Sequence, residues 1–253
     1  MRKVNQCLIL AAGNGTRLRS VSAGIPKPLV KFRGTPLLQH VILGAREAGI
    51  EEFVIVVGYR SDLIRSWFQN SSLTDVSVTW VENVEYHKNN GVSVLKARDA
   101  IRENFLLLMA DHIFDPQTAK ALTRQPLGRG EVILAIDSNV DCIFDLDDAT
   151  KVRREGDLIV DIGKEITSYD ALDTGMFLCS PALFDALELE KTNGNCSLSD
   201  GMRRLGQEQK FRGFDIGGAQ WQDVDTPEAL AYARTIFDKR FCGNLIAEEL
   251  ASV

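Results

Sequence analysis

A glycine-rich segment close to the N-terminus has the residue types that could hold a phosphate group. Leu8 to Leu18 reads LILAAGNGTRL, so an apolar run leads directly into Gly13, Gly15 and Arg17. Glycines let backbone N–H groups approach phosphate oxygens closely, and an arginine adds a planar, permanent positive charge. If the apolar run is the first strand of a parallel sheet, the segment predicts a phosphate-binding loop at the carboxyl edge of that sheet.

Two familiar phosphate-binding motifs do not fit this loop. The dinucleotide fingerprint needs a small residue where Leu18 stands, and an acidic residue about 20 positions further on, where the chain has Arg33 and Gly34. The P-loop motif needs Gly-Lys-Ser/Thr, which Leu18-Arg19-Ser20 does not provide. We therefore expect another class of phosphate-binding protein.

Several charged residues elsewhere could complete such a site. Lys27 lies between two prolines in IPKPL, which stiffen its backbone. Asp111 follows the apolar run FLLLMA, and Asp223 and Asp225 precede a predicted helix in QWQDVDTPEAL. Taken alone, Asp111 could mark the exit of a strand to solvent, and either later aspartate could cap the helix. We expect His112 to point away from Asp111 in a strand and interpret it as structural.

The elements that must position these residues follow an alternating pattern. Strand-length apolar runs are each followed by a helical pattern, which predicts an α/β fold with a mostly parallel, twisted sheet flanked by helices. The predicted strands span residues 7–12, 53–57, 105–110 and 132–136. Four helices are predicted: residues 35–49, a segment starting at Ser61, residues 92–102, and a segment starting at Pro227. In the first of them, Thr35 is the predicted N-cap and Pro36 stands at the first helical position.

The pattern changes after Asp137. Residues 150–154 and 158–162 flank a turn and predict a hairpin, and residues 171–179 predict a further strand. Alternating Val76, Val78 and Trp80 predict a half-buried strand in the first half. We therefore expect additional antiparallel strands in the C-terminal half.

Composition narrows the class of protein. The chain has 253 residues, of which 45% are hydrophobic and 25% charged, as in a globular protein with one domain. A net charge of -6 argues against nucleic-acid binding, so a few local cations must hold any anionic ligand. No apolar run reaches about 18 residues, so we expect no membrane segment, and we interpret the start as a strand rather than a signal peptide.

Cysteine usage bears on the compartment and on metal binding. The five cysteines are scattered, with no CxxC pair and no zinc-ligand spacing; they are Cys7, Cys142, Cys179, Cys196 and Cys242. This pattern predicts a reducing compartment and a cytoplasmic protein.

The loop and the lysine segment together resemble the nucleotidyltransferases that couple an NTP to a sugar phosphate or alcohol phosphate. The matching residues are Leu10, Ala11, Ala12, Gly13, Gly15, Thr16, Arg17 and Leu18, followed by Pro26, Lys27, Pro28 and Leu29. The resemblance implies a Rossmann-like fold of the nucleotide-diphospho-sugar transferase type. It also implies that the loop backbone, Arg17 and Lys27 hold the triphosphate.

The resemblance implies a metal site as well. In this family an acidic residue at the position of Asp111 binds Mg²⁺, and a second ligand comes from late in the chain. We favour Asp225 as this second ligand and keep Asp223 in reserve, because family members differ in the position that they use.

Further positions are implied for the base and for the acceptor. The base is recognised in the segment that holds Asn89, Asn90, Gly91 and Ser93, although these residues are also typical of any loop before a helix. Lys164 matches the position that holds the acceptor phosphate, and Asp173 matches a residue that faces the acceptor and could bind hydroxyl groups. We expect a single domain over residues 1–253, with a nucleotide-binding half over about 1–137 and an acceptor-binding half over about 138–253.

Over nearly its whole length the chain is most similar to inositol-1-phosphate cytidylyltransferases. The segments MADHIFDP, FDLDDATKV, DIGK, DTGMFLCS and DVDTPEAL carry this closer resemblance. It implies Mg²⁺-dependent attack of myo-inositol-1-phosphate (1D-myo-inositol 3-phosphate) on the α-phosphate of CTP, giving CDP-inositol and diphosphate. The implied partners are CTP and a phosphorylated polyol, and a homodimer is compatible with this class.

Three alternatives stay open. A phosphocholine cytidylyltransferase would need an aromatic cage for the quaternary ammonium, and Tyr59, Tyr86 and Tyr169 do not decide this from the sequence. A sugar-1-phosphate uridylyl-, thymidylyl- or guanylyltransferase would share the loop. A non-catalytic nucleotide-binding regulator would be expected to lose metal or phosphate ligands, whereas Arg17 and Lys27 are both present.

Overall fold

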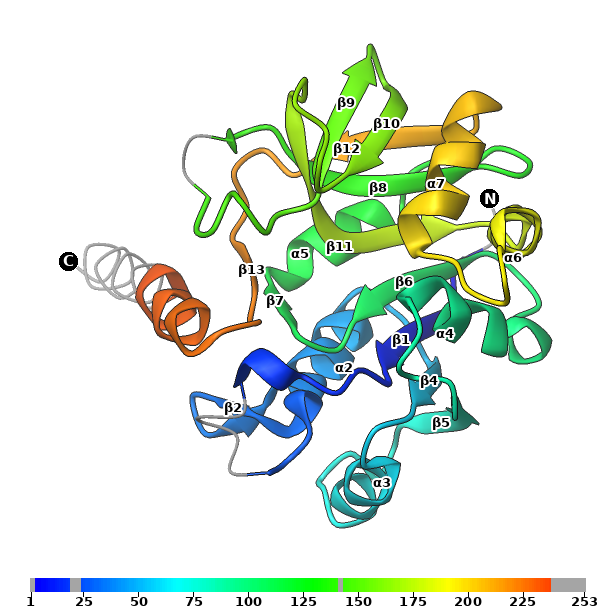
Figure 1. Ribbon diagram of the computed structural model, residues 1–253. Helices are drawn as coiled ribbons and strands as arrows, with labels where there is room; N and C mark the ends of the chain where they lie inside the picture. The colour runs from blue at the N-terminus through cyan, green and yellow to red at the C-terminus, as the bar shows by residue number, and fades with distance from the viewer. Residues whose placement is uncertain (1–2, 19–23, 141–142, 238–253) are drawn as a thin grey trace.

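The computed structural model describes residues 3–18, 24–140 and 143–237. In this part of the chain a nine-stranded sheet runs through the molecule in the order β5-β4-β1-β6-β11-β8-β12-β10-β9 (Figure 1). Two small two-stranded sheets lie beside it, β2 with β3 and β7 with β13. The predicted α/β fold is confirmed.

The N-terminal half supplies a parallel set of four strands. These are β5 (Ser77–Glu82), β4 (Glu52–Val57), β1 (Gln6–Ala11) and β6 (Phe105–Met109), and each neighbouring pair is parallel. The two central strands β1 and β6 are nearly continuous apolar runs, because helices cover both of their faces. Parallel strands end at the same edge, so the loops that follow β1 and β6 meet there.

The C-terminal half adds the predicted antiparallel strands. β11 (Ala171–Cys179) pairs antiparallel with β6 and with β8 (Val132–Asp137), and the hairpin of β9 (Lys151–Glu155) and β10 (Leu158–Gly163) follows further along. β12 (Phe211–Asp215) lies parallel to β8 and joins it to β10. β9 also pairs with the start of β11, so these five strands form a closed ring of pairings.

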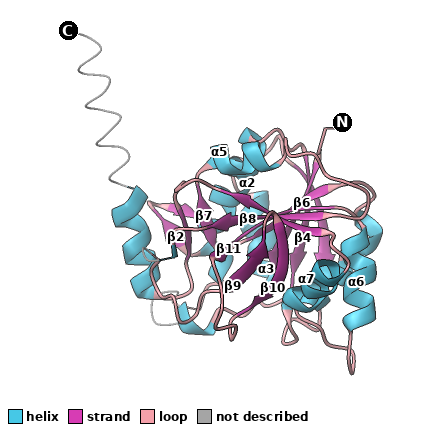
Figure 2. Cartoon of the chain, turned by 90° about the horizontal axis from the view of Figure 1, so that it is seen from above, coloured by secondary structure: helices cyan, strands magenta, loops and turns pink. Residues whose placement is uncertain are grey.

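Helices cover both faces of the sheet. One apolar cluster joins the sheet to α2 (Leu37–Glu47), α3 (Ser61–Gln69) and α5 (Pro116–Leu122). The other joins it to α4 (Asn90–Lys96), α6 (Ala182–Glu190) and α7 (Leu198–Gln207). Figure 2 shows α2 and α5 on one side of the strands and α6 and α7 on the opposite side. Residues 227–237 form a further helix, as predicted, and no described helix is long and apolar enough to cross a membrane.

Several short elements lie in the connections between the strands of the large sheet and its helices. They are the 3-10 turns η1 (Thr16–Leu18), η2 (Lys27–Leu29) and η3 (Arg98–Ala100), and the strands β2 (Lys31–Phe32), β3 (Thr35–Pro36), β7 (His112–Phe114) and β13 (Trp221–Asp223). β7 and β13 pair antiparallel and bring residues 221–223 to the edge where β6 ends.

Two predicted helix boundaries were wrong. Thr35 is not the N-cap of α2, because it pairs with Phe32 in a hairpin whose turn residues, Arg33 (φ 50) and Gly34 (φ 82), are both left-handed. The helix starts at Leu37 after Pro36. The helix predicted over 92–102 is also shorter, since α4 ends at Lys96 and η3 follows it. The buried Ile101 already has extended backbone that leads the chain into β6.

Candidate active site

Three of the segments that hold predicted site residues meet at one edge of the sheet. The loop that contains Gly13 and Arg17 follows β1, and Asp111 follows β6, the parallel neighbour of β1. Asp223 ends β13, which pairs with His112 of β7 in antiparallel register. This pairing carries residues 223–225 to the carboxyl edge of a sheet to which they do not belong.

Lys27 lies at the centre of this arrangement. Its side chain is only 8% exposed, and its Nζ lies 2.5 Å from Asp111 Oδ2 and 3.5 Å from Asp223 Oδ1. It also forms an ion pair with Asp225. The glycine loop packs directly on it, because a Cβ at Gly15, where φ is +54°, would lie 2.6 Å from Lys27 Cβ. Three carboxylates therefore share one buried ammonium group, and the glycine loop packs on the aliphatic part of the same side chain.

The charges of this cluster stabilise one another. Burial by itself would lower the pKa of Lys27, but the carboxylates of Asp111, Asp223 and Asp225 outweigh it and raise the pKa above its ordinary value. Burial would likewise raise the pKa of Asp111, yet Lys27 and His112 hold it well below its usual range. Lys27 and Asp111 are therefore both charged at neutral pH.

Asp148 connects the two predicted phosphate-binding cations. Arg17 Nη1 lies 2.5 Å from Asp148 Oδ2, and Lys164 Nζ lies 2.5 Å from Asp148 Oδ1. Arg17 also pairs with Asp225. Asp148 was not predicted from the sequence as a site residue, although the segment FDLDDATKV that contains it carries part of the resemblance. Three aspartates stand close together there, and only the tertiary structure shows which one faces the cations.

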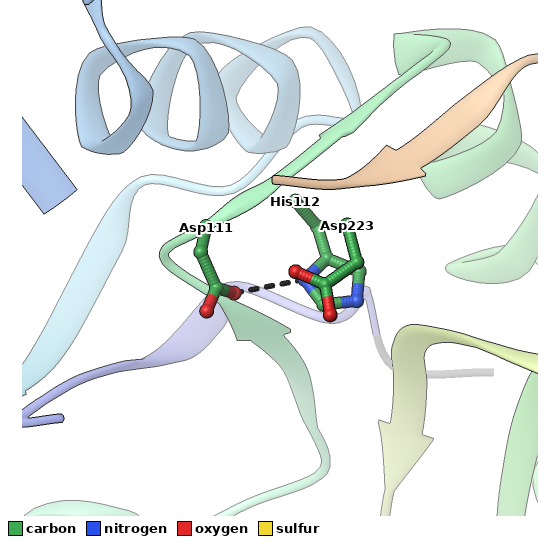
Figure 3. Close-up of side chains that lie close together, drawn as sticks. All are labelled: Asp111, His112 and Asp223. Atoms are coloured by element: carbon green, nitrogen blue, oxygen red, sulfur yellow. Dashed lines mark hydrogen bonds and ion pairs between the residues drawn. The ribbon is translucent and has the colours of Figure 1, made fainter. Parts of the chain in front are cut away.

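The expectation that His112 is remote from the site was wrong. Its Nδ1 lies 2.8 Å from Asp111 Oδ1 and 3.8 Å from Asp223 Oδ1, and Figure 3 shows the imidazole beside both carboxylates. β6 ends at Met109 and β7 begins at His112, so strand alternation does not run from Asp111 to its neighbour. Burial opposes the charged imidazole, but Asp223 and Asp111 raise the pKa of His112 to about 9.

The imidazole of His112 packs between Trp221 and the backbone of Gly175. Its ring stacks on Trp221 with the ring centroids 6.3 Å apart. On the side of β11, Gly175 has a φ of +75°, and a Cβ there would lie 2.6 Å from His112. The ring is therefore held between an indole and a bare backbone.

The donor set at this edge fits a divalent metal ion. Ligand atoms of Asp111, His112 and Asp223 lie within 4.8 Å of one another. Asp223 Oδ1 is buried without a hydrogen-bond partner among the described residues, and burial raises the pKa of this carboxyl group to about 6. A buried oxygen without a donor is costly unless a cation satisfies it. Carboxylate oxygens are the ligands that Mg²⁺ prefers, so the residues present fit this ion.

Two adjoining cavities of about 340 and 230 Å³ meet at this cluster and share Leu10, Gly13, Asp111 and Asp225. The smaller one is lined by the phosphate-loop residues predicted from the sequence, among them Ala11, Gly15, Thr16, Arg17 and Lys27. The larger one is lined by Ala12 of the loop and by predicted base and acceptor residues, namely Asn90, Ser93, Lys164 and Asp173. The predicted triphosphate region thus opens directly into the predicted base and acceptor regions.

Two predicted base-binding residues lie outside the lining of both cavities. The backbone N–H of Asn89 donates to Asn195 Oδ1 at 3.0 Å. A Cβ at Gly91 would lie 2.6 Å from the carbonyl oxygen of Cys196, so this glycine lets α4 approach the loop before α7. Asn90 has a comparable role, since its Oδ1 accepts from the Leu198 backbone N–H at 2.8 Å, but it also lines the larger cavity.

Asp173, which we predicted to face the acceptor, lines the larger cavity. Its Oδ1 accepts a hydrogen bond of 2.7 Å from the backbone N–H of Gly175. Burial raises the pKa of its carboxyl group to about 6, and the Gly175 hydrogen bond offsets only part of this effect. Asp173 can therefore accept hydrogen bonds from hydroxyl groups. Its carboxylate is held largely away from water, and this desolvation disfavours the charged form.

The fold and the site define a nucleotide-handling enzyme, and comparison with known proteins gives its family. Residues 7–210 match the model of the MobA-like NTP transferase domain. The chain belongs to this family and is a nucleotidyltransferase.

Particular relatives narrow the comparison. The chain is 37% identical over 224 residues to the bifunctional IPC transferase and DIPP synthase of Rubrobacter xylanophilus, covering 88% of this chain and 49% of the relative. It is 32% identical over 231 residues to the protein of the same name from Thermococcus kodakarensis, covering 90% of this chain and 50% of the relative. The chain thus spans about half the length of these curated relatives.

Solved structures agree on the fold. The inositol-1-phosphate CTP transferase from T. maritima superposes with a TM-score of 0.78 at 27% identity, covering 92% of this chain and 97% of that one. A UDP-glucose pyrophosphorylase in complex with UDP-glucose reaches a TM-score of 0.80 at 21% identity, covering 94% of this chain and 99% of that one, which is a likeness of fold. The expected nucleotide-diphospho-sugar transferase fold is confirmed.

Proposed function

We propose that this nucleotidyltransferase transfers a cytidylyl group from CTP to the phosphate of myo-inositol-1-phosphate (1D-myo-inositol 3-phosphate), giving CDP-inositol and diphosphate. The names of the relatives support the choice of substrates. The observation that carries the chemistry is Lys27, buried among three carboxylates at the foot of a glycine loop. This arrangement suits a metal-bound triphosphate.

The reaction is an in-line displacement at the α-phosphorus. An oxygen of the acceptor phosphate forms the new bond to phosphorus, and the bond from phosphorus to the oxygen that bridges to the β-phosphate breaks. Diphosphate leaves with that electron pair. The acceptor phosphate is already an anion at neutral pH, so no protein nucleophile is needed, and catalysis rests on positioning and charge neutralisation.

The chain's own residues divide this work. The backbone of the loop from Gly13 to Gly15, together with Arg17 and Lys27, binds the triphosphate, and Lys164 holds the acceptor phosphate. Asp173 accepts hydrogen bonds from the acceptor's hydroxyl groups. The positions of these side chains around the two adjoining cavities support the proposed roles.

Asp111 with Asp225, or with Asp223 in its place, would hold Mg²⁺. When bound, the ion supplies positive charge to the reacting phosphate. Three positive side chains, Arg17, Lys27 and Lys164, face Asp111, Asp148, Asp223 and Asp225. With the His112 imidazolium, whose pKa is raised to about 9, the positive and negative residues of the cluster balance, so an anionic triphosphate needs the added cation.

We also place the protein in the cytoplasm. Among the described cysteines, Cys7, Cys179 and Cys196 are free and buried, which suits a reducing compartment.

We further propose that one domain divides into two halves, with nucleotide binding in about 1–137 and acceptor binding in about 138–253. The residues predicted to bind the nucleotide lie mainly before residue 137, and Lys164 and Asp173 lie after it.

Diphosphate release tests the proposed reaction. Each of the four common NTPs is paired with inositol phosphate, phosphocholine and a sugar 1-phosphate, and we expect the highest turnover with CTP and inositol phosphate. Asp111→Asn should lower kcat/KM by about 10²-fold or more, because charge stabilisation at the reacting phosphate is lost. Asp99→Asn, an exposed aspartate, is the matched control. Absence of turnover with every pair would exclude the enzyme activity and favour the regulator.

The same panel separates the rival substrates. Tyr59 and Tyr86 lie edge to face with ring centroids 6.1 Å apart, but Tyr169 lies beside Lys151 instead. These three tyrosines therefore form no common cage for a quaternary ammonium. Lys164 and Asp173 on the acceptor side suit a phosphate and hydroxyl groups. Preferred turnover of phosphocholine or of a sugar phosphate would replace the inositol phosphate in this proposal.

A further inference from the structure

A fully buried asparagine lies behind the wall of the larger cavity. Asn83 directly follows β5, and its exposed fraction is 0%. Its backbone N–H donates to the carbonyl oxygen of Val57 at 2.7 Å, at the end of β4. A Cβ at Gly58 would lie 2.8 Å from the carbonyl oxygen of Asn83, so the two strand ends approach as closely as glycine permits. The position of Asn83 is therefore set by the sheet.

The orientation of the Asn83 amide is determined by a backbone group. Asn83 Oδ1 accepts from the backbone N–H of Glu85 at 2.9 Å. A backbone N–H can only donate, so the oxygen of the amide must face Glu85. The NH₂ group must then face the other way, and its Nδ2 lies 2.9 Å from Ser93 Oγ. Asn83 therefore presents a donor to the hydroxyl of Ser93.

This donor leaves Ser93 with a proton to give. A serine hydroxyl has one proton and two lone pairs, and the amide of Asn83 occupies a lone pair. Ser93 is 6% exposed and lines the larger cavity together with Leu10, Ala12 and Tyr86. Among the described residues, no carbonyl or carboxylate oxygen accepts the Ser93 proton. A ligand in the cavity is the remaining acceptor.

We propose that Asn83 is a positioning residue for base selectivity, which holds the Ser93 hydroxyl as a hydrogen-bond donor toward the nucleobase. The ring nitrogen N3 of cytosine is a bare acceptor, whereas N3 of uracil carries a proton. A donor held at this place pairs with cytosine and opposes a second donor in uracil. The inference rests on the proposed CTP-dependent function and names the device that selects the base.

The ratio of kcat/KM for CTP to kcat/KM for UTP, at saturating inositol phosphate, tests this role. Ser93→Ala removes the donor and should lower the ratio by about tenfold, as expected for one hydrogen bond to an unpaired partner. Ser93→Thr keeps a hydroxyl and should retain most of the ratio. A change that merely loosened the fold would lower both kcat/KM values together and leave the ratio unchanged.

Asn83→Asp probes the asparagine itself with little change in volume. One carboxylate oxygen still accepts from Glu85, and the other accepts from Ser93, which turns the lone pairs of the hydroxyl toward the cavity. The ratio should fall at least as far as in Ser93→Ala. In the double variant Asn83→Asp/Ser93→Ala the ratio should equal that of Ser93→Ala, because Asn83 acts only through the hydroxyl.

Two further variants serve as a control for the added charge and as a replacement if Asn83→Asp does not fold. Asn193→Asp adds the same charge at an exposed position between α6 and α7 and should leave the ratio unchanged. If Asn83→Asp does not fold, Asn83→Ala takes its place, with the expectation that the ratio falls toward that of Ser93→Ala.

The outcomes separate this inference from the proposed function. A wild-type preference for CTP with an unchanged ratio in the Asn83 variants would overturn the inference alone. A wild-type enzyme that uses UTP as well as CTP would overturn both.

Discussion

Single side chains in this site are held by charges that come from distant parts of the chain. The buried Lys27 contacts Asp111, Asp223 and Asp225, and Asp148 contacts both Arg17 and Lys164. Asp173 differs from these carboxylates because no cation neutralises it among the described ion pairs. Its raised pKa therefore makes it a source of instability in the folded protein.

Asp173→Asn is expected to stabilise the protein at neutral pH. The folded-state pKa of about 6 lies above the ordinary 3.8, so the folded state disfavours the carboxylate. The resulting cost is absent when both states are protonated, grows as the pH rises above about 4, and is complete above about 6. The variant should exceed the wild type by about 1–3 kcal/mol at pH 7.5, with a gap that shrinks toward pH 5.

Urea unfolding at pH 5, 6 and 7.5 measures this gap. Asp99→Asn is the control, since its exposed side chain should change the free energy of unfolding little at any of the three pH values. A gap for Asp173→Asn that stays constant or widens toward pH 5 would show that burial does not disfavour the carboxylate. The variant should also bind the acceptor less well, which a rise in its KM would report.

At the scale of elements, close packing of backbone on backbone positions the start of α4, which lines the larger cavity. The start of α4 lies against the loop before α7, where Asn90 accepts from the Leu198 N–H and Gly91 lies on the Cys196 carbonyl. Ser93 is in the next turn of the same helix. The position of the Ser93 hydroxyl therefore depends on how closely α4 approaches that loop.

Gly91→Ala is expected to destabilise the protein by about 1–3 kcal/mol, as other overpacking substitutions do. The added Cβ would lie 2.6 Å from the Cys196 carbonyl oxygen and 2.8 Å from Ser197 backbone atoms, so α4 must shift. Thermal unfolding measures the loss, and KM for CTP should rise because Ser93 moves. Gly163→Ala is the matched control, since the atoms nearest to its new Cβ are 3.8 Å away. Equal stability of the two variants would contradict the packing argument.

At the scale of the whole molecule, one sheet joins the two proposed halves. β6 of the first half pairs with β11 of the second over Phe105 to Leu108, and this seam lies in the middle of the strand order. Both apolar clusters include residues from each half, such as Leu107 and Phe177 in one and Leu106 and Leu178 in the other. Neither half has a core of its own.

We therefore expect the chain to unfold in one transition. Three probes should give the same urea midpoint: far-UV circular dichroism, the fluorescence of Trp80 in β5 and the fluorescence of Trp221 in β13. Each fluorescence is measured in a variant in which the other two tryptophans are replaced by Phe. Leu183→Ala, in the second half, should lower all three midpoints together, because it leaves a cavity in the shared core. Separate midpoints for the two tryptophans would show two independent units.

Local patterns predicted much of this architecture. The strands β1, β4, β6, β8 and β11, the β9–β10 hairpin and the α/β class follow from apolar runs and turn residues that act over a few neighbours. The errors arose where a distant partner decides. Thr35 resembles an N-cap but pairs with Phe32, and His112 follows Asp111 but belongs to a new strand that β13 holds in place.

The sequence by itself determined the family, the glycine-rich loop after the first strand and the types of side chain available for chemistry, because these depend on residue identity and short spacing. The tertiary structure alone decided which carboxylates surround Lys27, that Asp148 joins Arg17 to Lys164, and that Asn83 orients Ser93. The physical reason is the separation along the chain between the residues that interact. Spacing along a strand or helix constrains a few residues, whereas charge pairing and hydrogen-bond direction at the sheet edge depend on segments that only the completed sheet brings together.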